Sequence, residues 1–267
     1  MRIPEYEVYA VKFAQREARR VDHFIGGDPH DGPMPTAYYV WLIRGENEVI
    51  LVDTGFDAAI AAKRNRKFLY APRQALGRLG VTTEAIPQVV VTHLHNDHVG
   101  TLRDFPKARF HVQDDEIAFA TGRHMAQEFF SRPYEVEQVV DMVRLVFERR
   151  VRFHRGDSEI APGVQLLHVG GHTAGMQAVR VHTRRGWVVV ASDSSHYYEN
   201  FERRRCYPLV HRPDRMLEGY EALLNAAESP EHVIPGHDPL VMQRYASPSP
   251  DLEGVAVRLD AAPKNLK

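Results

Sequence analysis

The stretch that decides the fold is Val89-Val-Val-Thr-His-Leu-His-Asn-Asp-His98, in which a short apolar run leads directly into four side chains that can bind metal. The apolar run is typical of a strand buried on both faces. If the chain continues extended, His93 and His95 point to the same side, because side chains alternate along a strand with a period of two. Asp97 and His98 then lie at a turn, where we expect the chain to enter a helix. There they would face a second position close to the first.

These residue types indicate the kind of site. Imidazole and carboxylate groups bind zinc at about 2.0–2.2 Å. Nitrogen and oxygen ligands also accept manganese, iron or cobalt, so the sequence leaves the metal open. Cys206 is the only cysteine, which excludes a cysteine-rich structural zinc site and an internal disulfide. No residue is placed to activate its thiol, and we interpret Cys206 as a bystander.

With this motif the chain resembles the metallo-β-lactamase superfamily, whose characteristic pattern is His-x-His-x-Asp-His. Further motifs follow in the family's order over roughly residues 36 to 240: Asp53-Thr-Gly55, Gly170-Gly-His-Thr-Ala-Gly175, Ser192-Asp193 and Pro235-Gly-His-Asp238. The resemblance implies two metal sites, in which Asp193 bridges the ions and Asp53 supports the ligands from behind. The implied ligands are His93, His95 and His172 for the first metal, and Asp97, His98 and His237 for the second.

The resemblance also implies the fold, an α/β protein with an αβ/βα sandwich of two mixed β-sheets flanked by helices. The residue pattern alternates strand-rich and helical regions, which suits this architecture. We treat residues 1–267 as a single domain. Strands are predicted at 6–13, 38–43, 49–52, 89–92, 164–168, 177–182, 187–191 and 232–234, and helices at 57–66, 73–79 and 216–227.

The segment at about 125–150 is the most distinctive insert. Its valines from Val136 onward recur at helical spacing. Two interpretations stay open: a helical lid or lip over the active site, with Phe129, Phe130 and Tyr134 supplying an apolar wall, or an amphipathic helix packed on the sheet. The apolar character of the insert is compatible with a homodimer.

Two ions side by side, which we expect to be Zn²⁺, would share a water and lower its pKa, so that a metal-bridging hydroxide attacks a carbonyl carbon. Within the superfamily the chain most resembles the N-acyl homoserine lactonases. That resemblance implies opening of a lactone ring, with N-acyl homoserine lactone as the expected substrate. Hydrolysis of another carboxylic ester, lactone or thioester stays open, as does a metal-binding protein without activity.

Three residues are candidates for direct roles in catalysis. Asp97 is expected to pass a proton to the leaving group besides binding metal. Related lactonases carry a tyrosine three residues after the bridging aspartate, where this chain has His196, followed by Tyr197. Either His196 takes that role, or Tyr197 reaches the substrate, or neither does. His30, in the Gly/Pro-rich loop 26–35, could approach the cleft, whereas His23 is expected to be an ordinary surface or loop residue.

Composition limits the partners. The formal net charge of −1 over 267 residues gives no reason to expect nucleic acid. No apolar run reaches the 18 or more residues of a membrane span, and the N-terminus lacks the apolar core of a signal peptide. A single cysteine suits a reducing compartment. The sequence therefore predicts a cytoplasmic protein acting on a small-molecule lactone or ester.

Overall fold

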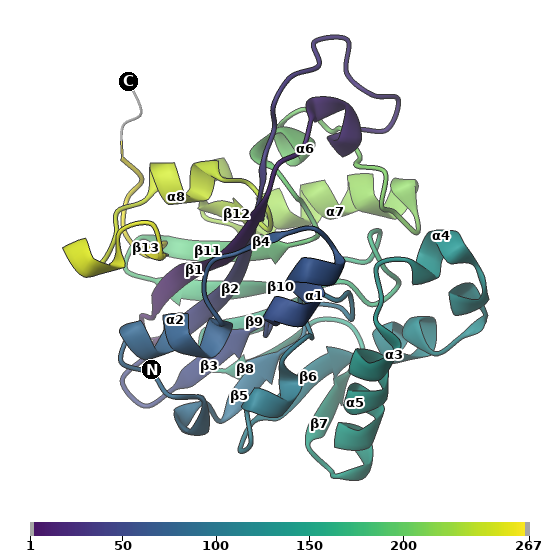
Figure 1. The fold of residues 1–267 in the computed structure, drawn as a ribbon. Helices are drawn as coiled ribbons and strands as arrows, with labels where there is room; N and C mark the ends of the chain where they lie inside the picture. Colours follow the sequence, from purple (N-terminus) through teal and green to yellow (C-terminus); the bar gives the residue numbers. More distant parts are fainter. Residues whose placement is uncertain (1–2, 265–267) are drawn as a thin grey trace.

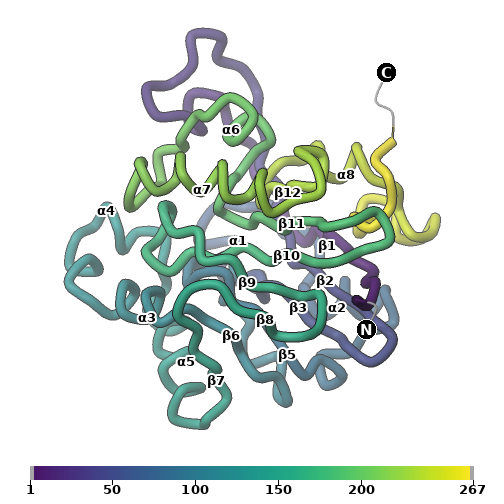
Figure 2. Tube along the Cα trace, turned by 180° about the vertical axis from the view of Figure 1, so that it is seen from behind, coloured from purple at the N-terminus to yellow at the C-terminus, as the bar shows by residue number. Residues whose placement is uncertain are grey.

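The computed structural model describes residues 3–264. Two β-sheets lie face to face, and helices cover their outer faces (Figures 1 and 2). Both sheets contain parallel and antiparallel pairs. The predicted αβ/βα sandwich of two mixed sheets is confirmed.

The larger sheet has eight strands in the order β13-β1-β2-β3-β5-β6-β7, with β4 paired to β1, and the smaller has five in the order β12-β11-β10-β9-β8. The strands are β1 Glu7–Arg16, β2 Thr36–Arg44, β3 Val49–Val52, β4 Lys67–Phe68, β5 Gln88–Val90, β6 Arg109–Gln113, β7 Val151–His154, β8 Ser158–Ala161, β9 Val164–His168, β10 Gln177–Thr183, β11 Gly186–Ser192, β12 Val233–Pro235 and β13 Ala256–Arg258.

The helices lie where the predicted helical spacing occurs, with several short ones added between strands. They are α1 Ala58–Lys63, α2 Pro72–Arg78, α3 Asp114–Ala120, α4 Glu128–Ser131, α5 Val136–Phe147, α6 Tyr198–Glu202, α7 Pro213–Ala226 and α8 Leu240–Arg244. Asp57 caps α1 by accepting the backbone N–H of Ile60 at 2.9 Å. Among residues 3–264, no helix combines the length and the apolar character that crossing a bilayer requires.

Two apolar cores hold these layers together. One lies between the sheets and includes Trp41, Leu166 and Val190, all fully buried. The other lies between the larger sheet and its helices and includes Leu76 and Met142. Burial of this kind is the main stabilising contribution to the fold, and it fixes the strand ends from which the polar loops emerge.

The loop after β5 departs from the prediction. Residues 95–101 form turns instead of a helix, and only the short 3-10 helix Leu102–Asp104 follows. The carbonyl of His98 accepts the backbone N–H of Thr54 at 2.7 Å, and Gly100 N–H donates to Gly55 O at 2.6 Å. Because the loop after β3 takes up these backbone groups, they are not available for helical hydrogen bonds. The expected helix entry at Asp97 was wrong.

The insert at 125–150 contains α4 and α5. Helix α5 packs against the larger sheet's core through Met142 and Leu145, whereas Val136 and Phe147 are exposed. Between the two helices, Arg132 and Pro133 reach the cavity described below. The insert thus has a packed helix and, just before it, a loop at the cavity wall.

Candidate metal centre

The structure brings all seven predicted ligands together where strands of both sheets end. In the first group, Nε2 of His172 lies 3.2 Å from Nε2 of His93 and 2.9 Å from Nδ1 of His95. Two nitrogens that bind one tetrahedral cation at about 2.0–2.1 Å are about 3.3 Å apart. The spacing of these three imidazoles is therefore close to that of a cation site.

Asp193 lies between the two groups. Its Oδ2 is 3.4 Å from Nε2 of His172, and its Oδ1 is 3.4 Å from Nε2 of His98 and 3.0 Å from Nε2 of His237. Asp97 completes the second group, with Oδ2 3.7 Å from Nε2 of His237. One carboxylate thus faces both groups, which is the arrangement of a bridging ligand.

In three of the histidines, the ring nitrogen that faces away from the centre is Nδ1, and it donates a hydrogen bond to an oxygen of the protein. Nδ1 of His98 donates to Asp53 Oδ2 at 2.7 Å. Nδ1 of His172 donates to the carbonyl of Leu209 at 2.7 Å, and Nδ1 of His237 donates to that of Ala37 at 2.8 Å. Because each Nδ1 carries the hydrogen, each Nε2 presents its lone pair to the centre, as metal-binding histidines do.

Buried polar atoms without hydrogen-bond partners indicate that the space between the two groups suits cations. Nε2 of His98 and Oδ1 of Asp193 are buried and have no hydrogen-bond partner within residues 3–264. Buried polar atoms without a partner are rare and costly. With imidazole and carboxylate donors at these distances, the residues present fit a pair of divalent cations.

The electrostatics support the same conclusion. Burial lowers the pKa of His93 well below its usual value and that of His172 to about 3, so both are neutral donors near neutral pH. Burial also disfavours charged His98, yet the carboxylates of Asp193, Asp53 and Asp97 outweigh it and raise its pKa well above the usual value. Such a raised pKa means that the carboxylates attract positive charge to this point, which a cation supplies as well as a proton.

A polar link behind the ligands ties three strand ends together. Asp53, after β3, accepts the backbone N–H and the hydroxyl of Thr92, both at 2.8 Å. The Thr92 hydroxyl also lies 3.0 Å from that of Ser192, at the end of β11. Asp53 and Ser192 have φ values of +60° and +46°, a left-handed conformation that costs energy in residues other than glycine. The surrounding contacts maintain this strain and so fix the direction of Asp193.

Gly236 is required by close approach. A Cβ atom there would lie 2.6 Å from the backbone of Ser192 and 2.8 Å from Oδ1 of Asp193. Only glycine leaves room for β12 to deliver His237 beside the bridging carboxylate.

Glu116, on α3, is a positioning residue that the sequence did not reveal. It is fully buried and accepts Leu94 N–H at 2.8 Å, the Thr173 hydroxyl at 2.6 Å and Gly175 N–H at 3.1 Å. It thus connects the loop of His93 and His95 to the loop of His172. A single glutamate in a helix carries no pattern that predicts such a role.

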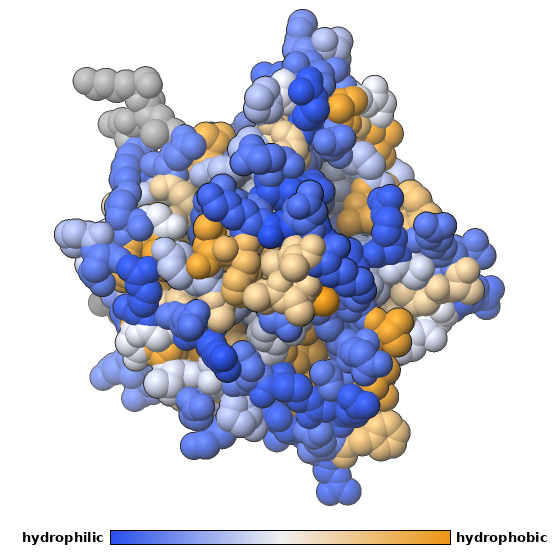
Figure 3. Space-filling model, in the orientation of Figure 1, coloured by the Kyte–Doolittle hydropathy of each residue, from blue (hydrophilic) through white to orange (hydrophobic). Residues whose placement is uncertain are grey.

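A cavity of about 490 Å³ opens in front of the centre. Figure 3 shows hydrophilic residues gathered on this face, between the upper lobe around α6 and the α1 region. Its lining combines ligands, arginines and a few apolar groups: Arg16, Asp22, His23, Thr36, Tyr38, Arg64, Arg66, His95, Asn96, Asp97, Arg132, Pro133, Asp193, His196, Tyr207, Pro208, Leu209 and His237.

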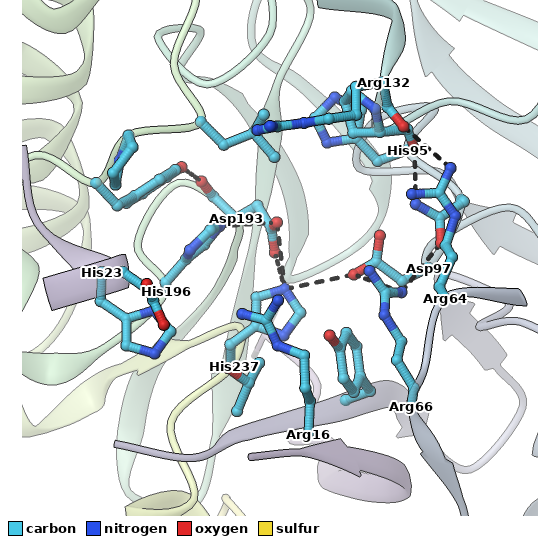
Figure 4. A pocket seen from close by; sticks show the side chains of 18 residues that line it. Arg16, His23, Arg64, Arg66, His95, Asp97, Arg132, Asp193, His196 and His237 are labelled. Atoms are coloured by element: carbon cyan, nitrogen blue, oxygen red, sulfur yellow. Dashed lines mark hydrogen bonds and ion pairs between the residues drawn. The ribbon is translucent and has the colours of Figure 1, made fainter. Parts of the chain in front are cut away.

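Of the two alternatives after Asp193, the structure brings only His196 to the cavity (Figure 4). Its Nε2 lies 3.0 Å from Asp193 Oδ2, and its ring stacks on Tyr207 with centroids 3.6 Å apart. Burial lowers the pKa of His196 to about 4. Tyr197 does not line the cavity and lies behind its wall: its buried hydroxyl is 2.9 Å from the Thr36 hydroxyl and 3.0 Å from His23 Nε2, and both of these residues line the cavity.

The other candidate residues differ in whether they line the cavity. His30 does not line it. His23, expected at the surface, is buried and lines the wall, so that expectation was wrong. The reason is that His23 lies in a short 3-10 helix, where its Nε2 is 2.9 Å from Met34 O. Tyr38 and Tyr207 line the cavity without having been predicted. Cys206 does not line it, and burial raises the pKa of its thiol.

The aromatic residues of the insert lie beside the centre. The ring of Tyr134 packs edge-on against His95, with centroids 4.6 Å apart. Phe129 and Phe130 line a small adjoining space together with His95 and His172. These rings border the first metal group on the side of the insert.

Comparison with known proteins agrees with this geometry. Residues 34–237 match the model of the metallo-beta-lactamase superfamily. N-acyl homoserine lactonase AiiB of Agrobacterium fabrum is 37% identical over 185 residues, which are 60% of this chain and 64% of that protein. An N-acyl homoserine lactonase of a Bacillus species is 30% identical over 61% of this chain and 66% of its own length. The chain thus matches just under two thirds of the length of these relatives.

A solved N-acyl homoserine lactone hydrolase, with the product N-hexanoyl-L-homoserine at its catalytic metal centre, superposes with a TM-score of 0.75. The match covers 91% of this chain and 96% of that one, at 22% identity, and it shows the shared fold. The matched family model covers every predicted ligand, and all seven converge on one centre. This chain belongs to the metallo-beta-lactamase superfamily.

Proposed function

We propose that the protein is a dinuclear metal-dependent hydrolase that opens a lactone ring, with N-acyl homoserine lactones as the first substrates to test. The observation that carries this proposal is Asp193 placed between two groups of imidazoles, directly beside a cavity that can admit a small molecule. The sequence similarity to N-acyl homoserine lactonases supports the choice of a lactone.

A pair of divalent cations bound here would supply Lewis acidity and would lower the pKa of a water toward neutrality. The chain's residues would do the rest. Asp97 lines the cavity, and although burial opposes its ionisation, His98 and Arg66 hold its pKa well below the usual value. Asp97 is therefore ionised, and we propose that its Oδ2 accepts a proton and delivers it to the alcohol oxygen that leaves when the ester C–O bond breaks.

His196 would orient the substrate. Its ring is fixed between Tyr207 and Asp193 at the cavity wall. A neutral imidazole in this place can form a hydrogen bond to the substrate carbonyl or to the leaving oxygen. This is the role that we propose for His196 in place of a tyrosine.

We propose Zn²⁺ as the resident metal, because the residues that would hold it are imidazoles and carboxylates, which are ligands that zinc prefers. Metal content measured by elemental analysis of protein purified without chelator tests this assignment. We expect two equivalents of zinc per chain.

The test of activity is hydrolysis of N-hexanoyl homoserine lactone by the zinc-loaded protein, followed by proton release and by mass spectrometry of the ring-opened acid. Asp97→Asn should lower kcat by about 100-fold or more, and His196→Gln should lower kcat/KM by about tenfold. Asp115→Asn, on the exposed first turn of α3, is the matched control and should leave turnover unchanged.

Two results would contradict the proposal. If zinc binds stoichiometrically but no lactone, ester or thioester turns over, the protein is a metal-binding protein without this activity. If only a thioester is cleaved, the site is hydrolytic, but the assignment of a lactone substrate is wrong.

A further inference from the structure

The cavity in front of the metal centre is lined by four arginines. They come from separate parts of the chain: Arg16 from β1, Arg64 and Arg66 from the segment between α1 and β4, and Arg132 from the loop after α4. Figure 4 shows the guanidinium groups of Arg16 and Arg66 directed toward the space beside His237 and Asp97.

Part of this positive charge has no compensating carboxylate. Arg64 is paired with Glu135, with Nη2 2.7 Å from Oε1. By contrast, Nε of Arg16 is buried without a hydrogen-bond partner within residues 3–264, and Arg132 is exposed at the cavity edge. Arginine side chains with few partners are common on open surfaces, but here four of them line one cavity in front of the metal centre.

Arg66 is largely buried. Its side chain is only 12% exposed, and Nη1 donates to Asn96 Oδ1 at 3.0 Å. The nearest carboxylate oxygen is Oδ2 of Asp97 at 3.9 Å, a group that we assign to the metal. Nε of Arg66 and Nε of Arg16 are both buried without a hydrogen-bond partner. Buried donors of this kind call for an acceptor.

The acidic groups that line the cavity do not cancel this charge. Asp97 and Asp193 belong to the proposed cation sites. Asp22 lies exposed at the rim, where its Oδ2 accepts the backbone N–H of Arg19 at 3.1 Å. Several like charges around a cavity of low dielectric repel one another, and an anion bound between them would relieve that repulsion. The charge is local, because the whole chain has a formal net charge of −1.

From this arrangement we infer that the substrate is a lactone bearing a carboxylate, which Arg16 and Arg66 bind while the ring ester faces the metal centre. The planar guanidinium group matches the two oxygens of a carboxylate. Arg132, at the edge of the cavity, adds electrostatic attraction for the anion. The inference rests on the proposed lactone hydrolysis. The carboxylate takes no part in bond making: water adds to the acyl carbon, the acyl C–O bond breaks, and the ring oxygen takes the proton.

The test uses two lactones that share a ring and differ in charge, 5-oxotetrahydrofuran-2-carboxylate and its carboxamide. Each kcat/KM of the zinc-loaded protein is divided by the lactone's own rate of hydrolysis by hydroxide, which removes the difference in intrinsic reactivity. We expect the carboxylate to be favoured by about tenfold or more, as one charge-assisted pair of hydrogen bonds provides. High salt should reduce this preference.

Substitutions then identify the arginines that cause this preference for the carboxylate. Arg16→Gln should remove most of it, mainly by raising KM for the carboxylate, and Arg16→Lys should retain part of it. Arg132→Gln changes an exposed side chain, so folding is not at risk, and it should reduce the preference about twofold to threefold. Arg155→Gln, an exposed arginine that does not line the cavity, is the control and should leave the preference unchanged.

The outcomes separate the two proposals. A normalised ratio near one in the wild type, with both lactones hydrolysed, would overturn the carboxylate inference and leave lactone hydrolysis standing. A preference that survives both Arg16→Gln and Arg132→Gln would also overturn it. Absence of turnover of either lactone, and of N-hexanoyl homoserine lactone, by fully zinc-loaded protein would overturn both proposals.

Discussion

Replacing Glu116 by glutamine should loosen both loops that carry the first metal group. Oε1 of Glu116 accepts Leu94 N–H and, at 3.4 Å, the Tyr134 hydroxyl, which can rotate; Oε2 accepts both the Thr173 hydroxyl and Gly175 N–H. A glutamine has one acceptor oxygen, so its NH₂ group must face either Leu94 N–H or Gly175 N–H. The Thr173 hydroxyl can rotate to accept from the amide, but a backbone N–H cannot.

The size of the effect follows from that count. One buried backbone donor is left without an acceptor, which costs about 1–3 kcal/mol. Glutamine also avoids burying a charge, since burial raises the pKa of Glu116 above its usual value, and this offsets part of the cost. A net loss of about 2 kcal/mol corresponds to a decrease in Tm of about 4–8 °C for a chain of this size. Because the loops of His95 and His172 both relax, we expect zinc affinity to fall by about tenfold.

The assay measures thermal unfolding of the metal-free protein by circular dichroism and zinc affinity by competition with a chelating dye. Asp115→Asn, on the same helix but exposed, is the matched control and should change stability by less than about 0.5 kcal/mol. The reasoning is refuted if the glutamine variant melts with the control and binds zinc as tightly as the wild type.

Three further changes have defined outcomes. Gly236→Ala places a methyl group 2.8 Å from Oδ1 of Asp193 and should reduce zinc affinity by about tenfold or more in the same competition assay; unchanged affinity would contradict the close-approach argument. Tyr197→Phe removes a hydroxyl that lies behind the cavity wall, bound to Thr36 and His23, so it should cost about 1 kcal/mol in urea unfolding and leave kcat/KM within about twofold; a large loss of activity would place Tyr197 in catalysis. Burial lowers the pKa of His111 to about 4 from 6.5, so the unfolded chain binds a proton first as pH falls, and stability is lost from about pH 6.5 toward pH 4. Between pH 7 and 5 this group should contribute about 2 kcal/mol of that loss, and His111→Gln should remove it; identical pH profiles for variant and wild type would show that His111 does not titrate this way.

The convergence of the seven candidate ligands could be predicted from the sequence because each lies in a short local motif after a strand. The bounds of β3 and β9 agree with those predicted, since their apolar runs stop at clear turn residues. The chain's path after His95 could not be predicted in this way. There the backbone hydrogen bonds go to Thr54 and Gly55, residues about 45 positions earlier, and contacts at that separation override local helix preference.

Supporting residues are harder to find for the same reason. Glu116 has the local sequence of an ordinary helix start, Asp114-Asp-Glu116, in which acidic residues favour the helix dipole. Its contacts with Leu94 and Gly175 exist only once the two loops are folded against α3. Tyr197 and His196 are adjacent in the sequence, and only the turn after β11 decides that one ring enters the cavity and the other leaves it.

The residues that would bind metal and the residues that would select the substrate come from different parts of this chain. The ligands lie between residues 93 and 237, within the stretch matched by the family model, whereas Arg16 and His23 precede residue 34. Strand β1 runs beside β2 in the larger sheet and brings Arg16 to the same opening as Arg66. Because the average charge of the sequence is near zero, composition gives no indication of this concentration of cations. If the carboxylate preference depends on Arg16, substrate choice is made in part by a strand outside the motifs that bind metal.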